Sequence, residues 1–177
     1  MNQLFTSIIF VGKICSGKSS LARSLSKKIE SPIASFGKYV KEYALKNGQS
    51  IERNNLQNLG QSFINDDPEN FLKDLIRFTG DSDLIIFEGV RHLVIYNAIK
   101  KLSHKSISFY LDVSTDMRFQ RFNNRESKSI SLTEFLEQDN HQVEKDIDIL
   151  QPLCDFVING TQEVDLLVEF IKSKIAS

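Results

Sequence analysis

Residues 12–19 combine the residue types and the spacing that bind a polyphosphate. They read Gly-Lys-Ile-Cys-Ser-Gly-Lys-Ser, which fits the pattern Gly-x-x-x-x-Gly-Lys-Ser/Thr. An apolar run at residues 8–11 enters this segment, and a helical pattern leaves it. The backbone N–H groups of such a turn point into one concavity, and the start of the helix adds a partial positive charge. The residues expected to surround a nucleoside triphosphate are Gly12, Lys13, Ile14, Cys15, Ser16, Gly17, Lys18, Ser19 and Ser20.

Two side chains of this loop indicate which ligands it takes. We expect Lys18 to place its ammonium on the β and γ phosphates, and the Ser19 hydroxyl to bind Mg²⁺. The expected cofactors are therefore ATP and Mg²⁺. The alternative is a glycine-rich turn that binds nothing, which the preceding strand and the following helix disfavour.

A carboxylate and a guanidinium follow another buried strand, at Glu88 and Arg91. Glu88 could hold a Mg²⁺-bound water or accept a proton from an attacking group; the alternative is a strand-end acid that faces solvent. Arg91 stands at the start of a helix, where its charge opposes the helix macrodipole. A residue in that place is well suited to bind a second phosphate through two hydrogen bonds, and an exposed surface arginine is the alternative.

Three further arginines are spaced three and four residues apart, at Arg118, Arg121 and Arg125. On a continuous helix this spacing puts them on one face. Arginines on a closing lid can neutralise the charge that develops on a transferred phosphoryl group. We favour Arg121 and Arg125 over Arg118 for this role; the alternative is an ordinary solvated charge stripe.

The end of a second predicted strand, at residues 33–36, is expected to line the pocket opposite ATP, with a simple turn as the alternative. The three histidines, His92, His104 and His141, have no metal-ligand spacing, so ordinary surface or core roles are expected of them. The candidate substrate-binding residues at this strand end are Ser35, Phe36, Gly37 and Lys38.

Strands and helices alternate along the chain, which predicts an α/β fold with a parallel sheet and helices on both faces. In such sheets the ligand lies beyond the carboxyl ends of the strands. Strands are expected at 8–11, 33–36, 84–87, 107–113 and 155–158. Helices are expected after the phosphate loop up to Pro32, at 38–47, around 56–63, from 67 to 80, at 92–102, 115–124 and 131–150, and after Thr161, which is expected to cap the last one.

Composition limits the class of protein. The chain has 177 residues, of which 41% are hydrophobic, and a net charge of −1, so one domain is expected and no nucleic-acid surface. Two cysteines without metal-ligand spacing fit a reducing cytosol. No apolar run is long enough to span a membrane, and the N-terminal residues lack the basic region of a signal peptide. A cytoplasmic protein, monomeric or homodimeric, is expected.

The chain resembles the P-loop kinases of the nucleoside monophosphate kinase group, with closest patterns in adenylate kinase-like and dephospho-CoA kinase-like small ATPases. The segments that carry the resemblance are 12–19, 35–38, 86–91, 116–121 and 155–161.

The resemblance implies a three-layer αβα fold, with a five-stranded parallel sheet in the order 2-3-1-4-5 and a short lid. It implies a single kinase domain over 1–177, with an acceptor-binding helical region at about 37–80 and the lid at about 118–130. By the same resemblance Arg91 binds the acceptor phosphate, and Arg121 and Arg125 are lid arginines. The residues that it places beside the donor adenine are Asn159, Gly160 and Thr161.

The sequence also departs from the family. Dephospho-CoA kinases have a catalytic aspartate after the second strand, where this chain has no acid, and Glu88 stands where many relatives have aspartate. The first departure favours a nucleotide acceptor, which needs no strong base. We therefore expect a nucleoside or deoxynucleoside monophosphate kinase. The alternatives are a dephospho-CoA kinase-like hydroxyl kinase with Glu88 or Asp112 as base, and a non-catalytic nucleotide-binding module.

Overall fold

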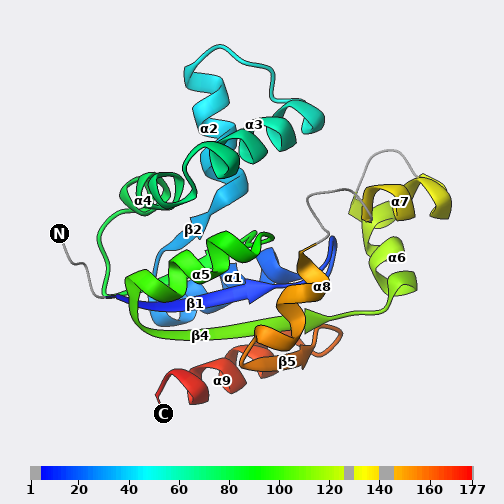
Figure 1. Ribbon diagram of the computed structural model, residues 1–177. Coiled ribbons are helices and arrows are strands. Elements are labelled where there is room, and N and C mark those ends of the chain that lie inside the picture. The colour runs from blue at the N-terminus through cyan, green and yellow to red at the C-terminus, as the bar shows by residue number, and fades with distance from the viewer. Residues whose placement is uncertain (1–4, 126–129, 140–145, 177) are drawn as a thin grey trace.

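The computed structural model describes residues 5–125, 130–139 and 146–176 (Figure 1). Its strands form one sheet in the order β2-β3-β1-β4-β5, and every neighbouring pair is parallel. The predicted order 2-3-1-4-5 is therefore confirmed. The strands are β1 (Phe5–Val11), β2 (Ile33–Ser35), β3 (Leu84–Glu88), β4 (Ser103–Asp112) and β5 (Phe156–Asn159).

Helices cover both faces of the sheet, as the alternating pattern predicts. One face packs against α1 and α9, and the other against α2, α4, α5 and α8. Among the described helices, none combines the length and the apolarity that a membrane crossing requires. The helices are α1 (Lys18–Ile29), α2 (Phe36–Lys46), α3 (Arg53–Asp66), α4 (Pro68–Thr79), α5 (Leu93–Leu102), α6 (Thr115–Arg125), α7 (Leu132–Asp139), α8 (Ile147–Leu150), a 3₁₀ turn (Gln151–Leu153) and α9 (Val164–Ile175).

The central strand β1 explains why its sequence is a continuous apolar run. Ile8 and Phe10 belong to the apolar cluster on the α1 face, whereas Ile9 and Val11 belong to the cluster on the opposite face. All four side chains are fully buried. Burying a side chain of this size contributes about 1.5–3 kcal/mol, so both faces of β1 hold the layers together. The same strand leads directly into the phosphate loop and fixes where that loop begins.

Two helix starts follow the local signals in the sequence. Asp67 caps α4, because its Oδ1 accepts the Asn70 N–H at 2.9 Å, and Pro68 occupies the first turn. Ser131 and Glu134 form a capping box: the Ser131 N–H donates to Glu134 Oε2 at 2.7 Å, and the Glu134 N–H donates to Ser131 Oγ at 3.2 Å.

The boundary between β2 and α2 differs from the prediction. Residue Phe36 begins α2 instead of ending the strand, because the Ser35 Oγ accepts the Lys38 N–H and caps the helix. The Phe36 ring turns inward and meets Phe71 edge-on, with 5.4 Å between the ring centroids. Strand β2 is therefore short, and α2 starts at the carboxyl edge of the sheet.

Strand β4 begins at Ser103, four residues before the predicted start. Its first half is polar, so apolar patterning does not reveal it. This half is held by pairing with β1 and by a side-chain hydrogen bond of 2.9 Å from Ser7 to Ser106.

The last helix is also capped differently from the prediction. Helix α9 begins after Glu163, and Thr161 does not cap it. The N–H and hydroxyl of Thr161 instead donate to Asn159 Oδ1, at 3.0 and 2.7 Å, in a local turn. The helix predicted over 131–150 is described as α7 and α8, and residues 140–145 lie outside the described part of the chain.

A polar network fastens β4 to the segment before β5. The N–H and hydroxyl of fully buried Ser108 donate to Asp155 Oδ2 at 2.8 and 2.6 Å. The Tyr96 hydroxyl lies 2.9 Å from Ser108 Oγ and donates to the Leu153 carbonyl at 2.7 Å. Burial raises the pKa of the neighbouring Cys154 to about 12, so its thiol stays protonated. The network fixes the edge strand against the sheet.

We predict that Asp155→Ala destabilises the protein by about 1–3 kcal/mol, because it removes the charged acceptor of a buried N–H and hydroxyl. The midpoint of urea unfolding measures this loss. Glu163→Ala is the control, since the Glu163 side chain makes no capping hydrogen bond, and we expect it to change stability by less than about 0.5 kcal/mol. Equal midpoints for the two variants would contradict the assigned role of the network.

Candidate active site

The loops that leave the carboxyl ends of the strands meet at one edge of the sheet. The phosphate loop follows β1, Ser35 and Glu88 end β2 and β3, and the turn after β5 closes on β4. That last closure is a hydrogen bond of 2.9 Å from the Gly160 N–H to the Asp112 carbonyl. The edge therefore brings together chain segments from all five strands.

The backbone of the phosphate loop has left-handed or related conformations at three positions. The φ angles are 147° at Gly12, 60° at Cys15 and 102° at Gly17. A Cβ on Gly12 would lie 2.9 Å from the Leu111 carbonyl oxygen, so glycine is required there for space as well as for φ. The loop then turns directly into α1, whose N-cap is Gly17.

Lys18 is held inside the loop. Its ammonium donates to the carbonyls of Gly12 and Lys13 at 2.6 and 2.7 Å, and to Ser16 Oγ at 3.2 Å. The residue is only 8% exposed. The charge therefore lies within the loop, where the first turn of α1 adds its own partial positive charge.

Two cavities meet at the phosphate loop, and Cys15, Lys18, Ser19 and Arg125 line both. The α3 cavity, of about 580 Å³, extends from the loop toward α2 and α3. The α9 cavity, of about 590 Å³, extends toward α9. The other residues of the α3 cavity are Ile14, Phe36, Gly37, Val40, Ile51, Arg53, Leu56, Gln57, Gly60, Gln61, Ile64, Phe71, Glu88, Gly89, Arg91, His92 and Ile95. Those of the α9 cavity are Ser16, Gly17, Ser20, Leu21, Arg23, Leu111, Arg121, Gly160, Gln162, Val164 and Leu167.

The walls of both cavities carry mainly positive charge. Arg53 and Arg91 line the α3 cavity, and Arg23 and Arg121 line the α9 cavity, in addition to the shared cations. Among the described lining residues of both cavities, Glu88 is the one acid. Such a concentration of cations around a loop of N–H groups suits a polyanion.

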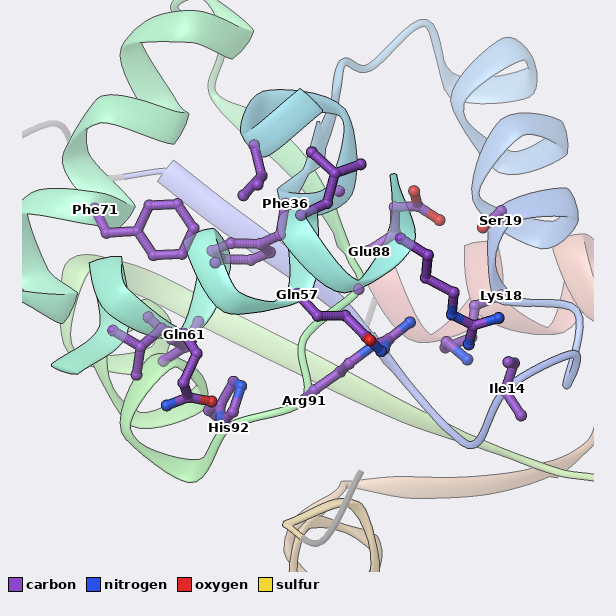
Figure 2. Close-up of a pocket in the computed structure, with 18 of the residues that line it drawn as sticks. Ile14, Lys18, Ser19, Phe36, Gln57, Gln61, Phe71, Glu88, Arg91 and His92 are labelled. Atoms are coloured by element: carbon purple, nitrogen blue, oxygen red, sulfur yellow. The ribbon is translucent and has the colours of Figure 1, made fainter. Parts of the chain in front are cut away.

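Glu88 is fixed by its neighbour in the sheet. The Ser35 hydroxyl donates to Glu88 Oε1 at 2.7 Å, across the register pair that joins β2 to β3. Figure 2 shows the Glu88 carboxylate and the Ser19 side chain directed toward the space beside Lys18. A hydroxyl and a single carboxylate fit Mg²⁺, which prefers oxygen ligands and keeps several waters and phosphate oxygens. No group of three or more His, Cys, Asp or Glu residues in the described chain forms a metal cage.

Arg91 and His92 enter the α3 cavity from the segment between β3 and α5. Figure 2 shows Gln57 directed toward Arg91, and Gln61 toward His92. Burial lowers the pKa of His92; the Asp146 carboxylate, 3.8 Å from Nδ1, opposes this shift, and the Arg91 charge adds to it. His92 therefore presents a neutral ring to the cavity at neutral pH.

The three arginines of α6 have different surroundings. Arg121 donates to the Ser16 carbonyl at 3.1 Å and to the Gly160 carbonyl at 2.9 Å, and Arg125 lines both cavities. Arg118 is buried in an ion pair with Asp139 and lines neither cavity. The predicted common face is thus divided between two cavity-lining arginines and one structural arginine. Residues 126–129 of the predicted lid lie outside the described residues.

Several predicted site residues lie beside the cavities and not in their walls. Lys13 pairs with Asp148 of α8 at 2.9 Å, and the Lys38 ammonium lies 5.9 Å from the centre of the Phe78 ring. Of the three residues predicted beside the adenine, Gly160 lines the α9 cavity. The partners of Lys13 and Lys38 belong to other helices, so the local sequence pattern does not reveal them. The predicted residues outside both sets of walls are Gly12, Lys13, Ser35, Lys38, Asn159 and Thr161.

One group of cavity-lining residues was not predicted from the sequence. Arg53, Gln57 and Gln61 line the α3 cavity from α3, and their spacing of four residues puts them on one helix face. The apolar residues Leu56, Leu59 and Phe63 identify this helix, but the polar stripe beside them was a second available signal. Helix α3 has no buried residue, so its polar face is open to a ligand.

Known proteins share the fold of this chain. Residues 8–145 match the AAA domain family. None of the curated proteins is significantly similar to the chain in sequence. Shikimate kinase from Aquifex aeolicus vf5 superposes with a TM-score of 0.65 and 19% identity, covering 96% of each chain. Shikimate kinase from Acinetobacter baumannii in complex with shikimate superposes with a TM-score of 0.64 and 19% identity, covering 98% of this chain and 94% of that one. A gluconokinase from Sinorhizobium meliloti 1021 superposes with a TM-score of 0.59 and 11% identity, covering 93% of this chain and 87% of that one. The expected likeness to small P-loop kinases is therefore confirmed at the level of the fold.

We predict that Gly160→Ala weakens both nucleotide binding and folding. A Cβ there would lie 2.6 Å from Val113 Cγ2 and 2.9 Å from the Ser16 carbonyl oxygen, so the turn must move away from the phosphate loop. We expect a loss of about 1–3 kcal/mol in stability and a raised Kd for an ATP analogue.

Gly37→Ala is the stability comparison, because a Cβ on Gly37 meets nothing within 4 Å. Since Gly37 lies in α2, this change should leave stability equal or raise it by about 0.5–1 kcal/mol. An unchanged melting temperature and Kd in Gly160→Ala would show that the two turns do not depend on one another.

Proposed function

Because the chain belongs to the AAA domain family and shares the fold of small P-loop kinases, we propose that it is an ATP-dependent phosphotransferase acting on a nucleoside or deoxynucleoside monophosphate. The observation that carries the proposal is the junction of two cavities at one cationic phosphate loop. A phosphoryl group bound at that junction is accessible from both sides. Donor and acceptor can then lie in line across it, as direct phosphoryl transfer requires.

ATP occupies the α9 cavity in this proposal. The polyphosphate lies on the phosphate loop, where the start of α1 and the Lys18 ammonium balance its charge. The base lies toward Gly160 and Gln162. Arg121 already has both the loop and the Gly160 turn as partners, so it holds the two sides of this cavity together.

The acceptor occupies the α3 cavity, whose two ends differ in chemistry. Near the loop, Lys18, Arg91 and Arg125 form a cationic end that suits the acceptor phosphate. Farther away, apolar side chains and two carboxamides form a slot for a flat heteroaromatic ring. A carboxamide carries both donors and acceptors, so it can pair with the polar edge of a nucleobase. The slot residues are Phe36, Phe71, Ile95, Gln57 and Gln61.

Metal binding fits the same arrangement. Ser19 and Glu88 would hold Mg²⁺, directly or through water, beside the bound phosphates. When bound, this ion neutralises charge on the transferred group and orients its oxygens. Ser35 supports the site by fixing one Glu88 oxygen.

The residues of the chain act mainly by positioning and by charge. Lys18, Arg91 and Arg125 hold the donor and acceptor phosphates close together despite their repulsion. The attacking group is an oxygen of an ionised phosphate, so no side chain has to remove a proton from it.

Transfer to a hydroxyl is the second candidate. Glu88 lines the α3 cavity beside Lys18, where it could accept the proton of an attacking hydroxyl. The similar solved structures are named shikimate kinase and gluconokinase. Asp112, the other candidate base, is exposed and lines neither cavity. We rank this candidate second because the far end of the cavity is apolar and amide-rich, whereas a small polyol acid needs many hydroxyl and carboxylate partners.

An acceptor screen tests the proposal. Purified protein is incubated with ATP, Mg²⁺ and a panel of ribo- and deoxyribonucleoside monophosphates, dephospho-CoA, shikimate and gluconate, and products are identified by mass spectrometry. Lys18→Ala is the inactive control. We expect a nucleoside diphosphate. A phosphorylated hydroxyl would replace the proposal by the second candidate, and binding of ATP without any phosphorylated acceptor would favour a non-catalytic nucleotide-binding module.

We predict that Arg91→Ala raises the KM for the acceptor about tenfold to a hundredfold, because a charge-assisted hydrogen bond contributes about 1.5–3 kcal/mol. The KM for ATP should stay the same, since Arg91 does not line the α9 cavity. Steady-state kinetics with each substrate varied in turn measure the two constants. The control is Arg77→Ala, which removes an exposed arginine paired with Asp74. Unchanged acceptor kinetics in Arg91→Ala would remove its assigned role.

Gln57→Leu and Gln61→Leu test the base slot. Each change keeps the volume but leaves a polar edge of the bound base unpaired, so kcat/KM for the acceptor should fall about fivefold to a hundredfold, corresponding to about 1–3 kcal/mol. Gln49→Leu, an exposed glutamine outside both cavities, is the matched control. If kcat/KM for the acceptor is the same in all three variants, the carboxamides do not meet the acceptor.

A further inference from the structure

A separate apolar cluster joins the phosphate loop to α6 and α7. Ile14 of the loop, Phe122 of α6 and Phe135 of α7 are buried together. The Phe122 and Phe135 rings meet nearly edge-on, with 5.5 Å between their centroids. These contacts are distinct from the two clusters that flank the sheet. The loop is therefore packed against α6 and α7 from its outer side.

Arg118 lies at the centre of this junction and is 2% exposed. Its Nη1 donates to the Ile14 carbonyl at 3.3 Å, and its Nε to the Val113 carbonyl at 3.2 Å. Both Nη atoms donate to the Asp139 carboxylate, at 2.5 and 2.8 Å, and Nη2 also reaches Thr115 Oγ1 at 3.2 Å. A guanidinium has five N–H donors in a fixed plane, and these five contacts use all of them.

The contacts of Arg118 tie three parts of the chain to one rigid group. Val113 follows β4, Ile14 belongs to the phosphate loop, and Asp139 ends α7. Helix α6 itself carries Arg121 and Arg125 to the cavities, three and seven residues farther along. Any rotation of α6 relative to the loop would break the Arg118 contacts and displace both arginines.

We propose that Arg118 is a positioning residue for nucleotide binding, which holds α6 on the phosphate loop so that Arg121 and Arg125 meet the bound polyphosphate. This inference rests on the proposed binding of ATP at the loop. Arg118 itself touches no ligand, since it lines neither cavity. Lysine cannot replace it, because an ammonium is a point charge without the planar set of five donors.

A double variant separates positioning from simple stabilisation. Removing one partner of a buried ion pair leaves an uncompensated charge, whereas replacing both by apolar residues of similar size often preserves stability. Arg118→Met with Asp139→Leu should therefore fold, which circular dichroism and thermal melting can check. We expect its Kd for an N-methylanthraniloyl ATP analogue with Mg²⁺ to rise about tenfold, the effect of one lost charge-assisted contact at the phosphates. Asp155→Ala, destabilised far from the loop, should keep the Kd of the wild type at a temperature where it is folded.

Arg121→Ala, introduced into the wild type and into the double variant, completes a mutant cycle. If Arg118 acts through Arg121, then Arg121→Ala raises the Kd strongly in the wild type and by a much smaller factor in the double variant. An equal increase in Kd in the wild type and in the double variant would overturn the inference. So would a double variant that binds the analogue as tightly as the wild type. The readout needs no acceptor: a wild type that binds the analogue but phosphorylates nothing in the screen refutes the proposed reaction alone. A wild type that does not bind the analogue refutes both.

Discussion

The backbone of the phosphate loop is the constraint on which the rest of the site depends. The chain must leave β1, adopt positive φ at Gly12, Cys15 and Gly17, and enter α1 within a few residues. A positive φ at a non-glycine residue costs free energy. Cys15 adopts this conformation because contacts from neighbouring segments hold the loop in place. The sheet, α6 and the turn at Gly160 supply those contacts, so much of the tertiary structure serves to hold one short turn.

Positively charged side chains also surround the phosphate loop. Lys18, Arg91, Arg121 and Arg125 come from three different segments, since the last two both lie in α6, and gather around one loop. Their mutual repulsion opposes folding, and a local cost of this kind is typical of a functional site. The structure limits the cost by giving the innermost charges backbone acceptors: Lys18 donates to two loop carbonyls, and Arg121 donates to the carbonyls of Ser16 and Gly160. A bound polyanion would relieve the remaining repulsion.

The proposed acceptor site depends on side chains that the shared fold does not determine. Solved structures with different names share this architecture at identities of 19% and below, so the fold alone does not identify an acceptor, which in our proposal lies in the α3 cavity. Here that cavity is bounded by α3, a helix with no buried residue, which presents a polar stripe to the interior. Such a helix can change its exposed face without disturbing the core. In the proposed reaction, a few side chains on the exposed face of α3 would therefore select the acceptor.

The sequence alone determined the phosphate loop, the parallel sheet, the capped starts of α4 and α7, and the arrival of Glu88 and Arg91 at the loop edge, because these depend on local patterns and on the rules of parallel sheets. The order of the strands followed from the resemblance to P-loop kinases. The tertiary structure decided the rest. It buried Arg118 against Asp139, turned Lys38 toward Phe78, extended β4 through a polar segment and brought Gln57 into the cavity. Each of these outcomes depends on a partner distant in sequence or on another helix, and the pattern around one residue carries no information about which partner the fold will bring beside it.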